Sequence, residues 1–579
     1  MKILTLHCDY IKFKPLKKAI KEPEELKEKG EISVKEPLVV LIAIEKGDND
    51  KTVAQLVDAV KKTASDVKAK NIVLYPYAHL SSNLSSPDTA LEYLVEAEQV
   101  LKKQGYNVSR APFGYYKEFE LKVKGHPLSE LSKEFRPEGL ALSPKDVVIR
   151  HDSSDNEQID PSRLLREISR SKLDTSKLKE NDHRILGQKL DLFSFNEASP
   201  GSVFWHPKGQ IIFNELLRFS RDLQKEMGYS EVSTPQIYSN KLWKVSGHWG
   251  HYKENMFLTE YEGKPAAVKP MNCPGHMLLY RTKSRSYKDL PMRFSEYSPL
   301  HRMELSGVLN GLFRVIRLHQ DDSHIFATIE QLESEISNVI NLAKKIYKET
   351  FKFEFDHINL STRPEKFLGK KEDWDRAEAA LEKVLKKSKI KYAVGKGEGV
   401  FYGPKIDFHI KDSMGRTWQC ATIQLDMQLP QRFELTYTGE DNKEHTPLVI
   451  HRAIFGSLER FIGVLLEHLN GNLPLWLSPV QVRIINFTDR NSKACEKILK
   501  ELEEEIPNLR IDSDLRSTTV SDKIRDAEMQ KIPYMIVIGD KEEESKTISV
   551  RARGDNKPNF KVKLKSLIEE IKEKIKKRA

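Results

Sequence analysis

The stretch RFSEYSPLHRMELSGVLNGLFRVIRLHQDDSHIF occupies residues 293–326. Arg302 and Glu304 lie two positions apart, so in a strand their side chains face the same side, and a loop containing glycine and serine separates them from Arg314. An arginine fork suits a phosphate, and a nearby carboxylate accepts a hydrogen bond from an exocyclic amine. A nucleotide site and a surface salt bridge are both compatible with this pattern.

A second arginine lies in a predicted helix downstream. The segment HRAIFGSLERFIGVLLEH at 451–468 has an apolar face, and Arg460 lies among its apolar residues. A buried arginine needs an anion, which is either a structural carboxylate or a substrate phosphate. Aromatic-rich strand patterns such as FEFDHINL at 353–360 and FYGPKIDFHI at 401–410 precede this helix. We therefore expect residues 186–472 to form one large antiparallel sheet flanked by helices.

The remaining sequence predicts further domains, since a chain of 579 residues is long enough for roughly three or four. Residues 141–185 are highly charged and predict a linker with a short helix around Pro161–Arg170. Residues 473–579 predict an α/β domain that ends in a basic helix. Residues 1–140 predict another α/β domain, with strands at Lys2–Leu6, Leu38–Ile44 and Ile72–Tyr75 and helices at Val53–Val67 and Thr89–Gln104.

Composition narrows the class of protein. The 95 lysines and arginines exceed the 85 acidic residues by a net charge of +10, which suits RNA better than a cationic partner. The four cysteines form no CxxC pair, which indicates a reducing environment. No apolar stretch approaches the roughly 18 residues that a bilayer requires, and the N-terminus shows no cleavage site. We expect a soluble cytoplasmic protein without membrane contact.

Seven segments together resemble a known family. HRMELSG with Arg302 and Glu304 resembles motif 2 of the class II aminoacyl-tRNA synthetases, GSLER with Arg460 resembles motif 3, and VSTPQI with Pro235 resembles motif 1. With MNCPGH, QDDSH, FYGPKIDF and WQCATIQLD, they resemble the threonyl-tRNA synthetases. Residues 1–140 look like the archaeal type of editing domain, related in fold to D-aminoacyl-tRNA deacylases. The last hundred or so residues resemble the anticodon-binding domain of several class II enzymes.

The resemblance implies both a fold and an activity. The fold is a multidomain α+β chain: editing domain (1–140), linker (141–185), class II antiparallel sheet core (186–472) and anticodon-binding α/β domain (473–579). The activity is formation of threonyl-adenylate from L-threonine and ATP with Mg²⁺, transfer to tRNA(Thr), and hydrolysis of mischarged seryl-tRNA(Thr). The motif 1 resemblance implies a homodimer.

The resemblance also implies one zinc ion per subunit, bound by Cys273, His324 and His451. Without it, cysteine and histidine residues this far apart are compatible with ordinary core or surface positions. Three such ligands leave one coordination position open. The amino group and the hydroxyl of threonine can both bind the metal, whereas isosteric valine lacks the hydroxyl. Asp322 is implied to accept from that hydroxyl, although an acid beside Asp321 is also compatible with a solvated position.

Further residues acquire roles from the resemblance. Arg302 contacts the α-phosphate of ATP, Glu304 the adenine amine and Arg460 the γ-phosphate, with Arg314 in the same site. His248 in SGHW is implied to deprotonate the ribose hydroxyl of the terminal adenosine, for which an ordinary histidine pKa is suitable, although a turn residue is the alternative. Lys405 joins the catalytic set, and the amino-acid pocket is implied to include Met271, Gln320, Tyr402, Gln419 and Gln424.

Serine requires a second site, because a missing methyl group is worth only about 1–3 kcal/mol in a pocket. YPYAHLSS, APFGYYKEFE and KGHPLSELS resemble editing-site segments and contain His79, Tyr116, Lys117 and Glu130. The family mechanism uses the 2′-hydroxyl of the tRNA and an oriented water, with Lys117 holding both. Arg525, Glu542 and Arg551 match anticodon contacts, whereas Ser517 replaces an asparagine of the best-known form.

Two other functions fit parts of the sequence. HQDDSH could form a hydrolase site in which Asp321, Asp322 and the two histidines bind a catalytic metal. This alternative leaves Arg302, Glu304 and Arg460 without a role. The other function is that of an RNA-binding regulator, which retains a synthetase fold without charging tRNA. Every catalytic position that the resemblance implies carries the expected residue, which argues against this function.

Overall fold

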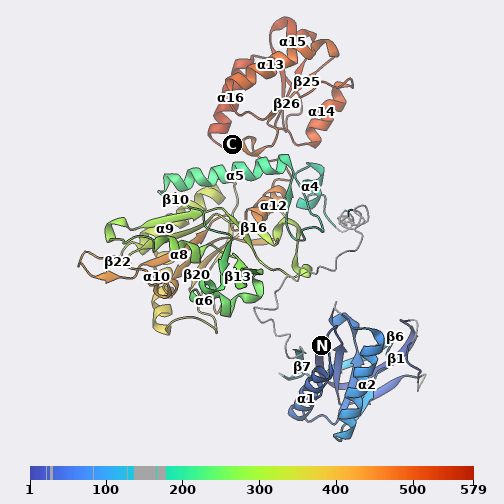
Figure 1. Cartoon of the computed structure of the whole chain (residues 1–579). Helices are drawn as coiled ribbons and strands as arrows, with labels where there is room; N and C mark the ends of the chain where they lie inside the picture. Colours follow the sequence, from blue (N-terminus) through green and yellow to red (C-terminus); the bar gives the residue numbers. More distant parts are fainter. Residues whose placement is uncertain are drawn as a thin grey trace. The chain divides into compact units, whose positions relative to one another are not determined.

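The computed structural model describes residues 1–20, 23–26, 30–81, 84–126, 128–135, 165 and 178–578. The chain forms two compact units, Met1–Arg150 and His151–Ala579 (Figure 1). The short helix predicted around Pro161–Arg170 lies outside the described residues except for Leu165. Within the described ranges, no helix has both the length and the apolar character needed to cross a bilayer.

The first unit is built around one long strand, β1 (Lys2–Lys18). Its first half pairs antiparallel with β3 (Pro37–Ala43) and β7 (Glu130–Glu134), and its second half with β2 (Ile32–Lys35) and β6 (Tyr115–Val123). β3 is buried along its whole length, as expected for an apolar strand covered on both faces. The sheet continues in parallel through β4 (Asn71–Pro76) and β5 (Asn107–Arg110), and the helices are α1 (Asp50–Asp66) and α2 (Pro87–Lys103).

The second unit contains the predicted large sheet. Eight strands follow the order β10-β14-β17-β24-β21-β20-β18-β19, with all pairs antiparallel except the two at the edges. Their bounds are β10 Ser230–Glu231, β14 Met292–Glu296, β17 Asp322–Ala327, β24 Leu448–Ala453, β21 Thr417–Asp426, β20 Lys405–Lys411, β18 Phe355–Ser361 and β19 Ala393–Gly395. The prediction of one mainly antiparallel sheet is therefore confirmed.

Successive side chains of these strands face opposite sides of the sheet. One side packs in the main apolar core, and the other carries the predicted polar site residues. Ile325 and Ile450 pack into the main apolar core with four helices, α5 (Pro207–Glu226), α9 (Leu332–Lys344), α10 (Lys371–Lys387) and α12 (Leu458–His468). Their neighbours Phe326 and Val449 pack on the opposite face with Met277 of α8 (Cys273–Tyr280). Because side chains alternate along a strand, Asp322, His324 and His451 belong to this second face.

The C-terminal residues form a separate five-stranded sheet within the second unit, in red in Figure 1. β25 (Val482–Asn486) pairs parallel with β26 (Ile511–Asp514) and β27 (Tyr534–Ile538), while β28 (Ile548–Ala552) and β29 (Asn559–Val562) continue antiparallel. The helices include α13 (Ser492–Glu505), α14 (Val520–Met529), α15 (Asp540–Ser545) and α16 (Leu564–Lys576). This alternation matches the α/β expectation.

Candidate active site

One cavity of about 540 Å³ opens on the polar face of the eight-stranded sheet. Strand register places neighbouring contributors opposite one another, with His324 facing His451 and His451 facing Gln424. The cavity wall brings together every residue predicted to bind the metal, ATP or the amino acid, together with Lys405: Cys273, His324, His451, Arg302, Glu304, Arg314, Arg460, Asp322, Met271, Gln320, Tyr402, Gln419, Gln424 and Lys405.

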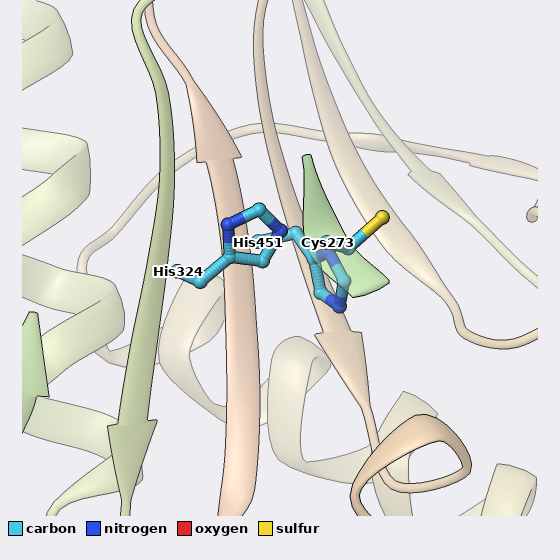
Figure 2. A group of neighbouring side chains, drawn as sticks. All are labelled: Cys273, His324 and His451. Carbon is cyan, nitrogen blue, oxygen red and sulfur yellow. The ribbon is translucent and has the colours of Figure 1, made fainter. Parts of the chain in front are cut away.

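A buried three-residue cluster lies at one side of this cavity. The ligand atoms of Cys273, His324 and His451 all lie within 4.8 Å of one another (Figure 2). Cys273 is the first residue of α8, and the two histidines are paired across β17 and β24. Three elements far apart in the sequence therefore converge on one point.

Hydrogen bonds define the tautomer of His324. Nδ1 of His324 lies 2.8 Å from Nδ1 of His276, and Nε2 of His276 lies 3.0 Å from the carboxylate of Glu296. Glu296 accepts the Nε2 proton of His276, so Nδ1 of a neutral His276 accepts from Nδ1–H of His324. Nε2 of His324 then bears a lone pair, and this buried atom has no partner among the described residues. An acceptor of that kind is suited to a metal ion.

Glu296 is held in its charged form. Burial alone would raise its pKa, but hydrogen bonds from His276, Lys269 and Ser298 lower it to about 2. Nζ of Lys269 lies 2.8 Å from the carboxylate, and the backbone N–H of Thr234 donates to it at 2.8 Å. The hydrogen-bonded series of His324, His276 and Glu296 therefore ends in a fixed negative charge.

The other two members of the cluster also fit a cation. His451 Nε2 lies 2.8 Å from the carboxylate of Asp426, which leaves Nδ1 as its second nitrogen. Burial raises the pKa of the Cys273 thiol well above its ordinary value, so a thiolate here needs a nearby cation. One sulfur and two imidazole nitrogens are typical of a zinc site with an open position, and each imidazole is hydrogen-bonded behind, His451 to Asp426 and His324 to His276.

The sequence prediction did not assign roles to His276, Glu296 or Asp426. His276 ends MNCPGH and Asp426 ends WQCATIQLD, so both lie in segments that had been singled out. Their contacts with the three-residue cluster become visible only when α8, β14 and β21 are placed around β17 and β24.

The adjacent acids Asp321 and Asp322 have different environments. Asp322 lines the cavity and accepts from the amide of Asn272 at 3.0 Å. Asp321 is fully buried and accepts from Arg452 at 2.8 Å and from two backbone N–H groups at 3.0 Å. The hydrolase alternative requires both acids at one metal, and the contacts of Asp321 argue against that.

Four arginines line the cavity, of which Arg452 pairs with Asp321 and the other three are Arg302, Arg314 and Arg460. Arg314 pairs with Glu304 at 2.8 Å, so the salt bridge considered for this region is present. Arg302 donates to the backbone oxygen of Pro270 at 3.2 Å, and Arg460 donates to that of Phe313 at 2.8 Å. Over the described ranges, neither Arg302 nor Arg460 forms an ion pair with a carboxylate. Burial lowers the pKa of Arg460, and the charges of Arg314 and Arg302 lower it further, so this region is suited to a multiply charged anion.

His248 differs from the other predicted catalytic residues. It is fully buried, packs beside Tyr402 and does not line the cavity. Nδ1 lies 2.8 Å from the hydroxyl of Ser246, and Nε2 has no partner among the described residues. Burial lowers its pKa to about 3, so the expectation of an ordinary pKa is wrong. Its imidazole is neutral at physiological pH, and a substrate reaches it only if Tyr402 or another neighbour moves.

In the first unit, the predicted editing residues occupy different surroundings. Lys117 donates to the backbone oxygens of Pro112 and Tyr115 at 2.9 and 3.2 Å and lies over the ring of Tyr75. Burial lowers its pKa to about 8.

His79 packs on Tyr77, whose ring contacts that of Tyr75, so an aromatic series connects His79 to Lys117. Tyr116 is exposed and, as the neighbour of Lys117 on β6, points to the other face. Glu130 begins β7 opposite Leu6. The structure connects Lys117 with His79 and shows neither Tyr116 nor Glu130 in contact with them within the described part.

The predicted anticodon residues lie in the C-terminal sheet domain. Arg525 of α14 is exposed and pairs with Asp522, while Arg551 of β28 pairs with Glu528 of the same helix at 2.8 Å. Glu542 caps α15 by accepting from the backbone N–H of Gly539. Ser517 donates to Asp489 at 3.1 Å. These side chains thus lie on or beside α14 and α15, and each contacts another group of the same domain.

Comparisons with known proteins agree with this architecture. Three family models match consecutive parts of the chain: the Archaea-specific editing domain of threonyl-tRNA synthetase at residues 1–135, the class II tRNA synthetase core domain (G, H, P, S and T) at 257–469, and an anticodon binding domain at 481–574. A crystal structure titled as the RNA binding domain of threonyl-tRNA synthetase from Cryptosporidium parvum is 41% identical, with a TM-score of 0.66, and the match covers 98% of it and 68% of this chain.

The chain belongs to the threonyl-tRNA synthetase family. The threonine–tRNA ligase of Caldanaerobacter subterraneus is 51% identical over 399 residues, and that of Acetivibrio thermocellus is 52% identical over 377 residues. These matches cover 69% and 65% of this chain but only 61% and 59% of the relatives. The chain thus spans about three fifths of these curated family members.

Membership of the family confirms the predicted fold class. The editing-domain, class II core and anticodon-domain resemblances each have a matching family model, in the predicted order. The model that matches residues 1–135 is that of the Archaea-specific editing domain, the type that the resemblance implied and related in fold to deacylases.

Proposed function

We propose that this chain is a threonine–tRNA ligase that forms threonyl-adenylate from L-threonine and ATP and transfers the threonyl group to tRNA(Thr). One observation supports this most strongly: a single cavity has the Cys273, His324 and His451 cluster in its wall together with arginines that lack carboxylate partners. The cluster suits an amino acid with a hydroxyl group, and the arginines suit a polyphosphate.

Cys273, His324 and His451 hold one zinc ion in this proposal. Zinc bound there supplies a Lewis-acid position that accepts an amine and a hydroxyl oxygen. Asp322 lies in the same wall and accepts a hydrogen bond from the threonine hydroxyl, with Asn272 fixing the orientation of its carboxylate. Valine has no group to satisfy Asp322, and a site built for a hydroxyl rejects such an analogue by several powers of ten. Met271, Tyr402, Gln419 and Gln424 complete the pocket.

The arginine side of the cavity binds ATP. Arg302 neutralises the α-phosphate, Arg460 contacts the γ-phosphate, and Arg314 and Glu304 lie beside the adenine, with Mg²⁺ sharing the charge of the bound nucleotide. The threonine carboxylate attacks the α-phosphorus, a new oxygen–phosphorus bond forms and pyrophosphate leaves. Gln320 and Lys405 line the same cavity. In this proposal the protein acts by positioning and charge neutralisation.

The other parts have separate tasks in this proposal. Residues 1–140 hydrolyse seryl-tRNA(Thr) with Lys117, His79, Tyr116 and Glu130, and residues 141–185 join them to the catalytic domain at 186–472. Residues 473–579 read the anticodon through Arg525, Glu542 and Arg551. His248 serves as the base in transfer after a local movement exposes it. The enzyme works as a cytoplasmic homodimer.

Threonine-dependent exchange of pyrophosphate into ATP tests the proposal. We expect exchange with threonine, none with valine and weaker exchange with serine, because serine retains the hydroxyl and lacks only a methyl group. If valine supports exchange as well as threonine does, the proposed recognition of the threonine hydroxyl is wrong. Absence of exchange with all three amino acids, in protein that contains zinc, would favour the non-catalytic RNA-binding alternative.

A further inference from the structure

We propose that His183 is a positioning residue that orients the ATP-binding arginines Arg314 and Arg460. This inference rests on the proposed function. His183 begins α4 (His183–Lys189) and lies within the stretch predicted as linker, outside every segment that resembles a family motif. Its side chain is completely buried in the second unit.

The imidazole of His183 bridges two catalytic segments. Nδ1 lies 2.7 Å from Oε1 of Glu467 on α12, and Nε2 accepts from the backbone N–H of Leu312 at 3.0 Å. Because Leu312 donates to Nε2, the ring proton is on Nδ1, from which it is donated to Glu467. The backbone N–H of His183 donates to the same carboxylate oxygen at 2.9 Å. The neutral imidazole therefore uses both nitrogens.

The loop before Arg314 is shaped to this histidine. Gly311 has a φ of +50°, and a Cβ at that position would lie 2.2 Å from Nε2 of His183. The ring of Phe313 packs on the imidazole with centroids 4.1 Å apart. The imidazole thus contacts three consecutive residues of the loop, Gly311, Leu312 and Phe313.

These contacts extend to both arginines. The backbone oxygen of Phe313 accepts from Nε of Arg460 at 2.8 Å, and Arg314 follows Phe313 in the chain. Movement of residues 311–313 would displace the acceptor of Arg460 and the backbone of Arg314 together. One side chain outside the cavity therefore determines how two guanidinium groups point into it.

A metal site is the competing explanation, since Asp182, His183 and Glu467 lie close enough to hold an ion. Both ring nitrogens of His183 are already used, the second carboxylate oxygen of Glu467 pairs with Arg416, and Asp182 accepts from Arg184 at 2.9 and 2.8 Å. Because these donors and acceptors are already hydrogen-bonded within the protein, the group is better explained as a structural contact between α4, α12 and residues 311–313 than as a metal centre.

Kinetics of full-length His183→Asn test the proposal. The amide nitrogen of asparagine can replace Nδ1 and retain the bond to Glu467, but its amide oxygen does not extend to the position of Nε2, so Leu312 N–H loses its acceptor. A buried donor left unpaired weakens the ATP site, so we expect the KM for ATP in pyrophosphate exchange to rise about tenfold. The KM for threonine and the zinc content should not change. His468→Asn, one residue after Glu467 on α12, is the matched control and should behave like the wild type.

A double-mutant cycle provides a second measurement. Gly311→Ala should also raise the KM for ATP, because its Cβ collides with the imidazole, and its effect should be smaller when His183 is already alanine. An unchanged KM for ATP, with a lower kcat and melting temperature in His183→Asn, would overturn the positioning role. If the wild type shows no threonine-dependent exchange, the proposed function fails, and the role of His183 is then tested by calorimetric measurement of ATP binding. Equal ATP affinity in the wild type and His183→Asn would overturn that role. Weaker ATP binding by the variant would support it.

Discussion

Nδ1 of His324 lies 2.8 Å from Nδ1 of His276, so one histidine determines the tautomer of another. We expect His276→Phe to lower zinc affinity by about 10- to 100-fold, the usual effect of removing a partner of a metal ligand. His276→Gln should retain more zinc, because its amide oxygen can still accept from His324. Competition with a chelator measures both. Equal zinc affinity in the phenylalanine variant and the wild type would contradict the role of His276.

Arg460 should be required for adenylate formation and dispensable for tRNA binding. Its guanidinium donates to the backbone oxygen of Phe313, and its charge has no carboxylate partner in the described part of the chain. Removing a guanidinium that stabilises phosphate charge costs about a thousandfold in rate. Arg460→Ala should therefore lose pyrophosphate exchange at unchanged tRNA affinity in filter binding. If Arg460→Ala unfolds, or loses pyrophosphate exchange and tRNA affinity to the same extent, Arg460 has a structural role instead.

Editing should depend on the charge of Lys117. Burial lowers its pKa to about 8, so the ammonium predominates below that pH and the neutral amine above it. Two protons of the ammonium are donated to Pro112 and Tyr115, which leaves the third for the substrate. Deacylation of seryl-tRNA, corrected with Lys117→Met for uncatalysed hydrolysis, should decrease as pH rises through about 8. An increase over that range would indicate that Lys117 acts as a base.

Fidelity should be separable from charging. The chain forms two compact units, and the whole cavity lies in the second. A truncated chain beginning at residue 141 should retain threonylation and accumulate seryl-tRNA, because a missing methyl group provides only about 1–3 kcal/mol of discrimination. The measurement is the amount of seryl-tRNA after incubation with serine. If it equals that of the full chain, residues 1–140 are not the editing site.

The sequence predicted the sheet and its cavity residues better than their supporting contacts. Alternating apolar patterns predicted the strands, and the family segments identified the residues that line the cavity. The pattern in HRMELSG did not determine which arginine pairs with Glu304, because Arg302 is two positions away and Arg314 is the partner. Pairing across a loop depends on tertiary structure.

Burial was the second property that local patterns did not predict. SGHW contains small and polar residues, yet Tyr402 and Phe401 enclose His248 from a segment far away in the chain. The predicted linker likewise gave no sign that His183 belongs to the core, because its partners Leu312 and Glu467 are distant in sequence. Long-range packing determines both environments.

X-ray absorption at the zinc edge of the purified full-length protein tests the central claim most directly. We predict one zinc per chain with one sulfur and two imidazole nitrogens as protein ligands, as the Cys273, His324 and His451 cluster requires. Threonine should change the spectrum by adding nitrogen and oxygen ligands, valine should not, and Cys273→Ser should lose the sulfur and most of the zinc. Absence of zinc, or a spectrum that threonine leaves unchanged, would contradict an open metal centre that recognises the amino acid.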